Sequence, residues 1–103
     1  MKQLEQEFAQ ELQRRLETAA RECGVEQKRL SAEAARYGGV SCARELLRRR
    51  RLSDGFDALA RLGRLDLSLE ALVTAGKYGA LFTDEEVNHC FGVLCEAGYF
   101  VFR

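Results

Sequence analysis

The sequence predicts a compact, single all-α domain built from five or six short helices around one hydrophobic core. Apolar residues recur every three or four positions, glycines stand singly or as one pair where helices would end, and proline is absent. The length of 103 residues and the 47% hydrophobic content allow one modest core. No Pro/Gly/Ser-rich linker divides the chain, so we expect residues 1–103 to form one domain.

The N-terminal helix is predicted over residues 1–24 by the most regular apolar stripe in the chain. The stripe consists of Leu4, Phe8, Leu12, Leu16, Ala19 and Cys23. Gly24 is the expected stop after the helix. A stripe this long and narrow is also compatible with a homodimer interface. It is too short for a coiled coil, however, so packing into the chain's own core is the favoured interpretation.

Two helices are predicted on either side of Gly38-Gly39, over residues 26–37 and from residue 40 or 41 onward. Their expected apolar faces are Leu30, Ala34 and Tyr37, then Val40, Ala43, Leu46 and Leu47. Helix, glycine turn, helix is typical of a DNA-reading motif. In that register Glu45 and Arg48 would occupy positions that the motif needs apolar. An ordinary helical hairpin is therefore the favoured interpretation.

Four consecutive arginines, Arg48, Arg49, Arg50 and Arg51, close the third predicted helix. Between residues 28 and 51 there are eight basic and two acidic residues. Basic side chains near a helix C-terminus suit the helix dipole, which explains part of this cluster. A continuing helix would place Arg50 and Arg51 on the apolar face. Either the helix stops near Arg49, or these two side chains leave the core and meet a carboxylate or a phosphate.

Cap and turn residues predict the helices of the second half. Ser53-Asp54-Gly55 begins a short helix that Gly63 ends. Its apolar residues are Phe56, Leu59, Ala60 and Leu62. Leu65 and Leu67 alternate with polar residues and are compatible with a brief extended segment. Ser68 is the expected N-cap of a helix that carries Leu69, Leu72 and Val73 and that Gly76 ends.

The last helix has the sharpest start signal, because Thr83 and Glu86 match the S/T-x-x-E capping box. Phe82 and Val87 occupy the two positions of a hydrophobic staple, and Gly98 is the expected stop. Capping accounts for the acidic run of residues 84–86, which we do not assign to metal binding or catalysis. The predicted core is Phe8, Leu12, Leu16, Leu30, Leu46, Leu47, Phe56, Leu59, Leu65, Leu69, Leu72, Val87, Phe91 and Leu94.

The residues that follow, Tyr99-Phe100-Val101-Phe102-Arg103, include three aromatic side chains. An exposed apolar tail is a binding element or a liability. Two interpretations stand: the tail packs beside the first helix, or it docks on another chain.

Catalytic and metal motifs are not found in the sequence. His89, Cys90 and Cys95 lack the close Cys or Cys/His pairing of structural zinc sites, and five-residue spacing on a helix separates the two thiols. Phosphate-binding glycine loops are also missing. We therefore expect no enzyme, metal or cofactor. Met1-Lys2-Gln3-Leu4-Glu5 has no apolar run, and no stretch is long enough to span a membrane, so a cytoplasmic protein with free thiols is expected.

The segments SDGF (53–56), LGRLDLSLEALV (62–73), LFTDEE (81–86) and GY (98–99) resemble a small all-helical domain that is widespread in anaerobic gut bacteria. The resemblance covers residues 25–99 and leaves residues 100–103 as an additional apolar tail. That family has no established activity, so no functional residue is carried over. The resemblance implies a bacterial cytosolic protein encoded on a mobile element.

The leading hypothesis is a non-catalytic protein-interaction module. Its net charge is zero, but residues 1–52 carry +4 and residues 53–103 carry −4, which can orient a partner. A small phage- or mobile-element-encoded inhibitor of a nucleic-acid-handling machine is one concrete form. The predicted contact residues are Arg44, Arg48, Arg49, Arg50, Arg51, Tyr99, Phe100 and Phe102. The alternative is direct nucleic-acid binding by the basic surface of residues 28–51; a metal- or thiol-dependent enzyme is the least favoured hypothesis.

Overall fold

The computed structural model describes residues 2–99, which form α-helices and short 3-10 helices and contain no strand. The elements are α1 (Lys2–Cys23), α2 (Lys28–Tyr37), α3 (Gly39–Arg48), α4 (Phe56–Arg61), η1 (Leu65–Leu67), α5 (Leu69–Val73), η2 (Gly79–Leu81) and α6 (Asp84–Glu96). The predicted all-α class is confirmed.

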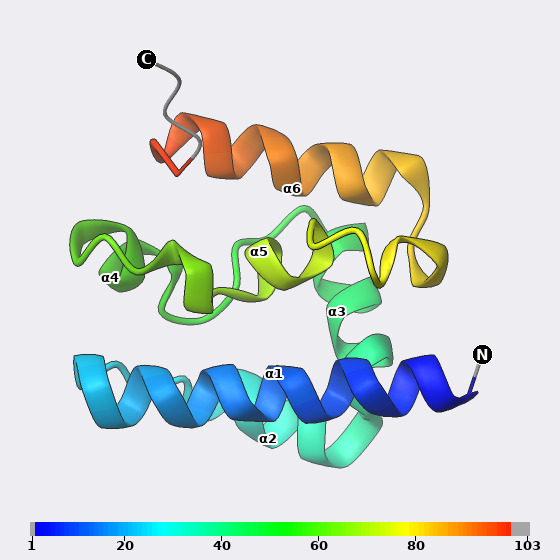
Figure 1. Cartoon of the computed structure of the whole chain (residues 1–103), viewed down its shortest axis with the longest axis horizontal. Helices are drawn as coiled ribbons and strands as arrows, with labels where there is room; N and C mark the ends of the chain where they lie inside the picture. The colour runs from blue at the N-terminus through cyan, green and yellow to red at the C-terminus, as the bar shows by residue number, and fades with distance from the viewer. Residues whose placement is uncertain (1, 100–103) are drawn as a thin grey trace.

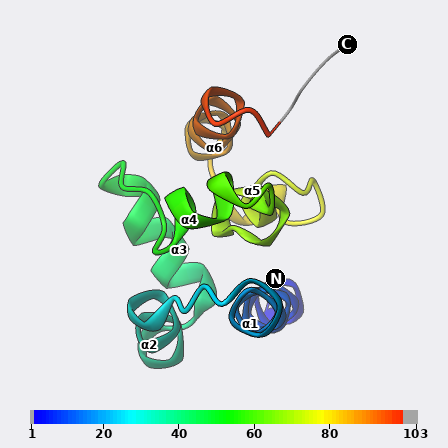
Figure 2. The ribbon, with the colours of Figure 1, turned by 90° about the vertical axis from the view of Figure 1, so that its left-hand side faces the viewer.

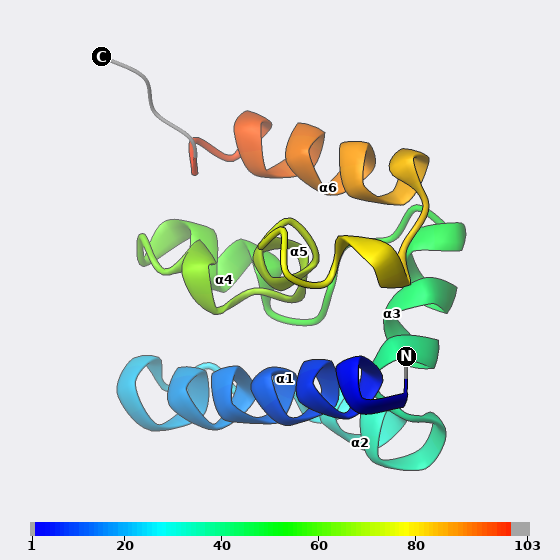
Figure 3. The same ribbon diagram turned by 45° about the vertical axis from the view of Figure 1, so that its right-hand side comes forward.

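The helices are arranged in three tiers (Figure 1). Helices α1 and α2 lie side by side at one end of the molecule, and α6 lies at the other end (Figures 1 and 2). The short elements α4, η1, α5 and η2 fill the tier between them. Helix α3 runs across the tiers from the α1–α2 layer toward the start of α6 (Figure 3).

The apolar stripe of α1 packs into the chain's own core, as favoured over a dimer interface. Phe8, Leu12, Leu16 and Ala19 are buried in clusters that also contain side chains of α2, α3 and the middle tier. The ring of Phe8 meets Tyr78 edge-on and Phe82 at a tilt, with both pairs of ring centroids 5.3 Å apart. These aromatic contacts attach η2 and the start of α6 to the N-terminal helix.

Helix α5 joins two parts of the core. All five of its residues are buried; Leu69, Leu72 and Val73 pack in one cluster with α1 and α3, and Ala71 packs in a second with α4 and η1. The second cluster also contains Leu94 of α6. The short, leucine-rich centre of the sequence therefore supports the tiers on both sides.

The predicted caps are present in the structure. Ser68 Oγ accepts a hydrogen bond from the Ala71 N–H at 3.1 Å. At the start of α6, Thr83 N–H donates to Glu86 Oε1 at 2.8 Å, and Glu86 N–H donates to Thr83 Oγ1 at 3.1 Å. Both halves of the capping box are thus formed.

Several packing predictions are wrong. Phe91 is 40% exposed, because α6 turns Val87, Cys90 and Leu94 toward the core and leaves Phe91 beside this stripe. Tyr37 is 59% exposed, because α2 ends there and α3 departs in another direction. The residues 65–67 form a 3-10 turn rather than an extended segment, since Leu67 N–H donates to the Arg64 carbonyl.

Candidate functional site

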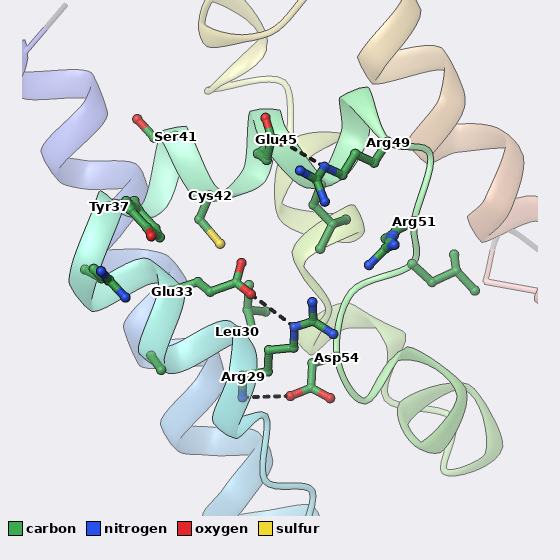
Figure 4. A pocket seen from close by; sticks show the side chains of 14 residues that line it. Arg29, Leu30, Glu33, Tyr37, Ser41, Cys42, Glu45, Arg49, Arg51 and Asp54 are labelled. Atoms are coloured by element: carbon green, nitrogen blue, oxygen red, sulfur yellow. Dashed lines mark hydrogen bonds and ion pairs between the residues drawn. The ribbon is translucent and has the colours of Figure 1, made fainter.

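Helices α2 and α3 meet at an open corner that contacts α1. Gly38 has a φ of +91°, a conformation that L side chains rarely adopt. A Cβ on Gly39 would lie 3.1 Å from Ala9 Cα, so the bare backbone is needed for close contact with α1. From this turn the two helices diverge as the arms of a V (Figure 4). The corner is more open than the ordinary hairpin predicted from the sequence.

A cavity of about 840 Å³ lies between the arms, and residues 51–54 border it on the remaining side. We call it the α2–α3 groove. Leu30, Cys42 and Leu46 form its apolar part. Tyr37 and Leu52 also line it, although they are 59% and 45% exposed. Its volume lies within the range of natural ligand sites.

The thiol of Cys42 points into the groove (Figure 4). Burial, and secondly the negative charge of Glu33, raise the pKa of Cys42 to about 11. The thiol is therefore protonated at neutral pH and contributes an uncharged, weakly polar surface. A nucleophilic role would need the opposite shift in pKa.

Three of the five predicted contact arginines are held by other groups of the chain. Arg44 donates from Nε and Nη2 to the Leu81 carbonyl at 3.0 and 2.6 Å, which ties α3 to η2. Arg48 and Arg49 both bind Glu45, at 2.7 and 2.8 Å. Hydrogen bonding to Arg48 is the main cause that lowers the pKa of Glu45, and the same pair raises the pKa of Arg48. These guanidinium groups are therefore only partly available to a partner.

Arg50 and Arg51 lie just beyond α3, which ends at Arg48. This agrees with the alternative in which the helix stops near Arg49. Arg50 N–H donates to the Leu47 carbonyl and Arg51 N–H to the Leu46 carbonyl, the two bonds of a Schellman motif. Arg50 has a φ of +54° and is the one non-glycine residue with positive φ within residues 2–99. Neither side chain makes an ion pair or hydrogen bond with another described residue.

The two arginines border different cavities. Arg51 lines the α2–α3 groove. Arg50 lines a second cavity of about 500 Å³ between α3 and the start of α6, where His89, Glu85 and Glu86 are also found. The predicted basic surface is therefore divided by the end of α3 into two parts with different neighbours.

Tyr99 lies far from the arginines. It follows the C-terminal end of α6, whereas α3 approaches the N-terminal end (Figure 3). The 13 residues of α6 span roughly 20 Å. Tyr99 and the arginines thus do not form one contact surface. Phe100 and Phe102 lie outside the described residues, and so does the rest of the predicted apolar tail, residues 100–103.

Sequence reasoning missed the buried carboxylate that holds one wall of the groove. Glu70 is 1% exposed and accepts hydrogen bonds from Ser53 N–H at 2.8 Å and Ser53 Oγ at 2.6 Å. The neighbouring Asp54 Oδ2 accepts from the backbone N–H of Arg29, in the first turn of α2, at 3.2 Å. These bonds fix residues 51–54 beside the groove. A lone glutamate within the apolar run of residues 69–73 was the available signal.

The ionisation of Glu70 is governed by its burial. Loss of solvent raises the pKa of Glu70, and the hydrogen bonds from Ser53 and the nearby charge of His89 offset part of this effect. Cys90, which packs close by, has its pKa raised to about 12, mainly by burial. Cys95 is exposed on the same helix, so the two thiols and His89 do not converge.

No group of three His, Cys, Asp or Glu side chains within residues 2–99 is arranged to hold a metal ion. Among these same residues, each helix is too short or too polar to cross a bilayer. Comparison with protein-family models, curated proteins and solved structures gave no match. The chemistry of the α2–α3 groove is therefore the basis on which we infer a function.

Proposed function

We propose that this chain is a non-catalytic protein-interaction module that binds a segment of a partner protein in the α2–α3 groove. The observation that carries the proposal is the exposure of Tyr37 and Leu52 at the lining of one 840 Å³ cavity. Fully burying an exposed large apolar side chain contributes about 1.5–3 kcal/mol, and a partner that covers the exposed part of Tyr37 and Leu52 gains roughly half of this from each. Tyrosine and arginine beside an apolar patch are also characteristic of binding hot spots.

The state of the arginines supports a protein partner over a phosphate backbone. Arg44, Arg48 and Arg49 have internal partners, and Glu45 places negative charge among them. A phosphate-binding surface uses several free cations together. The groove instead offers two partly exposed apolar side chains, Tyr37 and Leu52, to a partner. An inhibitor of a nucleic-acid-handling machine is one form that such a module would take.

The test is affinity capture with the tagged full chain from a lysate of the organism that encodes it, with and without nuclease, read by mass spectrometry. The proposal expects one defined protein that stays bound after nuclease treatment. If all capture disappears with nuclease, or if no protein is retained above the tag alone, the proposal is contradicted.

A second candidate function, direct nucleic-acid binding, is supported by the unpaired side chains of Arg50 and Arg51. Two phosphate contacts predict a weak complex whose affinity falls with salt, with a log–log slope of about −2 on duplex DNA. Fluorescence anisotropy with a labelled duplex tests this salt dependence, at salt concentrations from about 20 to about 200 mM. A slope near zero, or no binding at the lowest salt, excludes it.

A further inference from the structure

The α2–α3 groove has more positive than negative side chains. Four arginines line it, Arg29, Arg36, Arg49 and Arg51, against the three acids Glu33, Glu45 and Asp54. One positive charge is therefore in excess at the same place where Tyr37 and Leu52 are exposed. Which charges remain available depends on the contacts that each makes within the chain.

Each carboxylate in the groove already has a partner. Arg29 Nε donates to Glu33 Oε1 at 3.1 Å, and Arg49 Nε donates to Glu45 Oε1 at 2.8 Å. Asp54 Oδ2 accepts from the backbone N–H of Arg29 at 3.2 Å. Figure 4 shows all three contacts; those of Arg29 with Glu33 and with Asp54 lie at the side of the groove opposite Arg49. Glu33 and Glu45 are thus each paired with an arginine, and Asp54 is bonded to a backbone N–H.

Two of the four arginines are not bound to a carboxylate. The guanidinium of Arg36 lies over the ring of Tyr37, 5.3 Å from its centroid. Arg51 makes no ion pair or side-chain hydrogen bond with any residue of the described range 2–99. It precedes Leu52 in the sequence, and both residues line the groove. A charged group and an apolar surface are thus offered together by one short segment.

We propose that the groove accepts a short acidic, apolar segment of the partner protein. A carboxylate of this segment pairs with Arg51, and its large apolar side chains cover Tyr37 and Leu52. A guanidinium binds a carboxylate through two parallel hydrogen bonds, and neighbouring apolar groups strengthen the pair by excluding water. The inference rests on the proposed function, since it names the kind of segment that the same groove binds.

The position of residues 51–54 supports this assignment. Ser53 is bonded twice to the buried Glu70, and Asp54 is bonded to the start of α2. The backbone that directly follows Arg51 and Leu52 is therefore tied to α5 and to the first turn of α2. A pre-positioned segment loses less conformational entropy on binding than a free loop.

The experiment is a selection of random dodecapeptides displayed on phage against the full chain, with counter-selection on Leu52→Ser. Groove-dependent peptides should be enriched in Asp or Glu together with large apolar residues. Selection on Arg51→Glu should lose the acidic preference. Selection on Arg61→Glu should keep it, because Arg61 is an exposed arginine of α4 outside the groove. Circular dichroism establishes that the variants fold.

A selected peptide then gives a quantitative result by fluorescence anisotropy. Arg51→Glu should weaken its affinity about tenfold or more, and Arg61→Glu should leave it within about twofold. Groove-dependent peptides without an acidic excess, or equal losses in both variants, would overturn the charge assignment while leaving the proposed function intact. Failure to enrich any groove-dependent peptide would overturn the inference, and the lysate capture would then decide separately on the proposed function.

Discussion

Ser53 and Glu70, 17 positions apart in the sequence, form a buried pair in which the serine N–H and hydroxyl each donate to a different carboxylate oxygen. The pair joins the turn before α4 to helix α5. Because residues 51–54 border the α2–α3 groove, the same pair connects the centre of the core with the proposed binding surface. A single buried carboxylate therefore affects both the stability of the fold and the shape of the groove.

Glu70→Gln should change how folding stability depends on pH. Burial raises the folded-state pKa of Glu70, so in the window between its unfolded and folded pKa values the folded protein binds a proton that the unfolded chain has released. Stability is therefore greatest below the unfolded pKa and falls as the pH rises through the folded pKa. Gln can accept from the Ser53 N–H through its amide oxygen and donate from its amide nitrogen to Ser53 Oγ, and it removes this slope. Urea unfolding at a series of pH values measures it.

The control for this prediction is Glu70→Ala. It leaves Ser53 N–H without its buried acceptor and creates a void, so we expect a loss of about 2–4 kcal/mol at low pH, where protonated Glu70 stabilises the wild-type fold most, and a smaller loss as the pH rises. Identical pH slopes in the wild-type chain and the Gln variant would show that Glu70 does not titrate in this window.

Arg50→Gly should stabilise the fold by about 1 kcal/mol. Arg50 occupies the left-handed position of a Schellman motif, where a side chain meets the following carbonyl. Glycines occupy the equivalent position after α4 and α6, at Gly63 and Gly98. Gly98→Ala is the matched reverse change and should destabilise by a similar amount. Thermal unfolding of both variants would refute the expectation if Arg50→Gly lowered the midpoint.

Gln27→Met should raise the free energy of unfolding by about 1 kcal/mol. The amide of Gln27 is buried, and neither its oxygen nor its nitrogen has a hydrogen-bond partner among the described residues. An unpaired buried amide costs about 1–3 kcal/mol, and methionine fills a similar volume without that cost. Denaturant titration is the measurement. A loss of stability would mean that the amide is hydrogen-bonded in solution.

Thiol labelling of the native chain should separate the exposed cysteine from the two buried ones. Cys95 is exposed and should react rapidly with iodoacetamide at pH 8, whereas Cys42 and Cys90 are buried and remain protonated. Peptide mass spectrometry should find Cys42 and Cys90 at least roughly tenfold slower than Cys95, with equal labelling in denaturant. Rapid native labelling of Cys90 would contradict the packing of α6.

Features whose partners lie close in the sequence could be predicted. The Thr83–Glu86 capping box and the Ser68 cap each join residues three apart, so local chemistry specifies them. The bonds from Ser53 to Glu70 and from Arg44 to the Leu81 carbonyl join residues 17 and 37 apart. No periodicity encodes such contacts, because they depend on how the helices pack.

The candidate site was only partly predictable for the same reason. The arginine run identified a charged region, but the sequence does not show that Glu45 binds two of its members or that Arg44 is tied to η2. The groove itself depends on the angle between α2 and α3, which the glycine pair permits but does not specify. Phe91 shows how far helical spacing can predict the core. The spacing identifies an apolar face several residues wide, but the packing of the neighbouring tier determines which of those residues are buried.

The most direct test of the groove compares two exposed leucines. Leu52 lines the groove and is 45% exposed, whereas Leu62 lies beyond α4, outside the groove, and is 54% exposed. Serine at either position should leave the fold intact. In quantitative affinity capture, Leu52→Ser should reduce the bound partner about tenfold or more, and Leu62→Ser should keep it within about twofold of wild type. Equal capture by the two variants would contradict the assignment of the α2–α3 groove as the binding site.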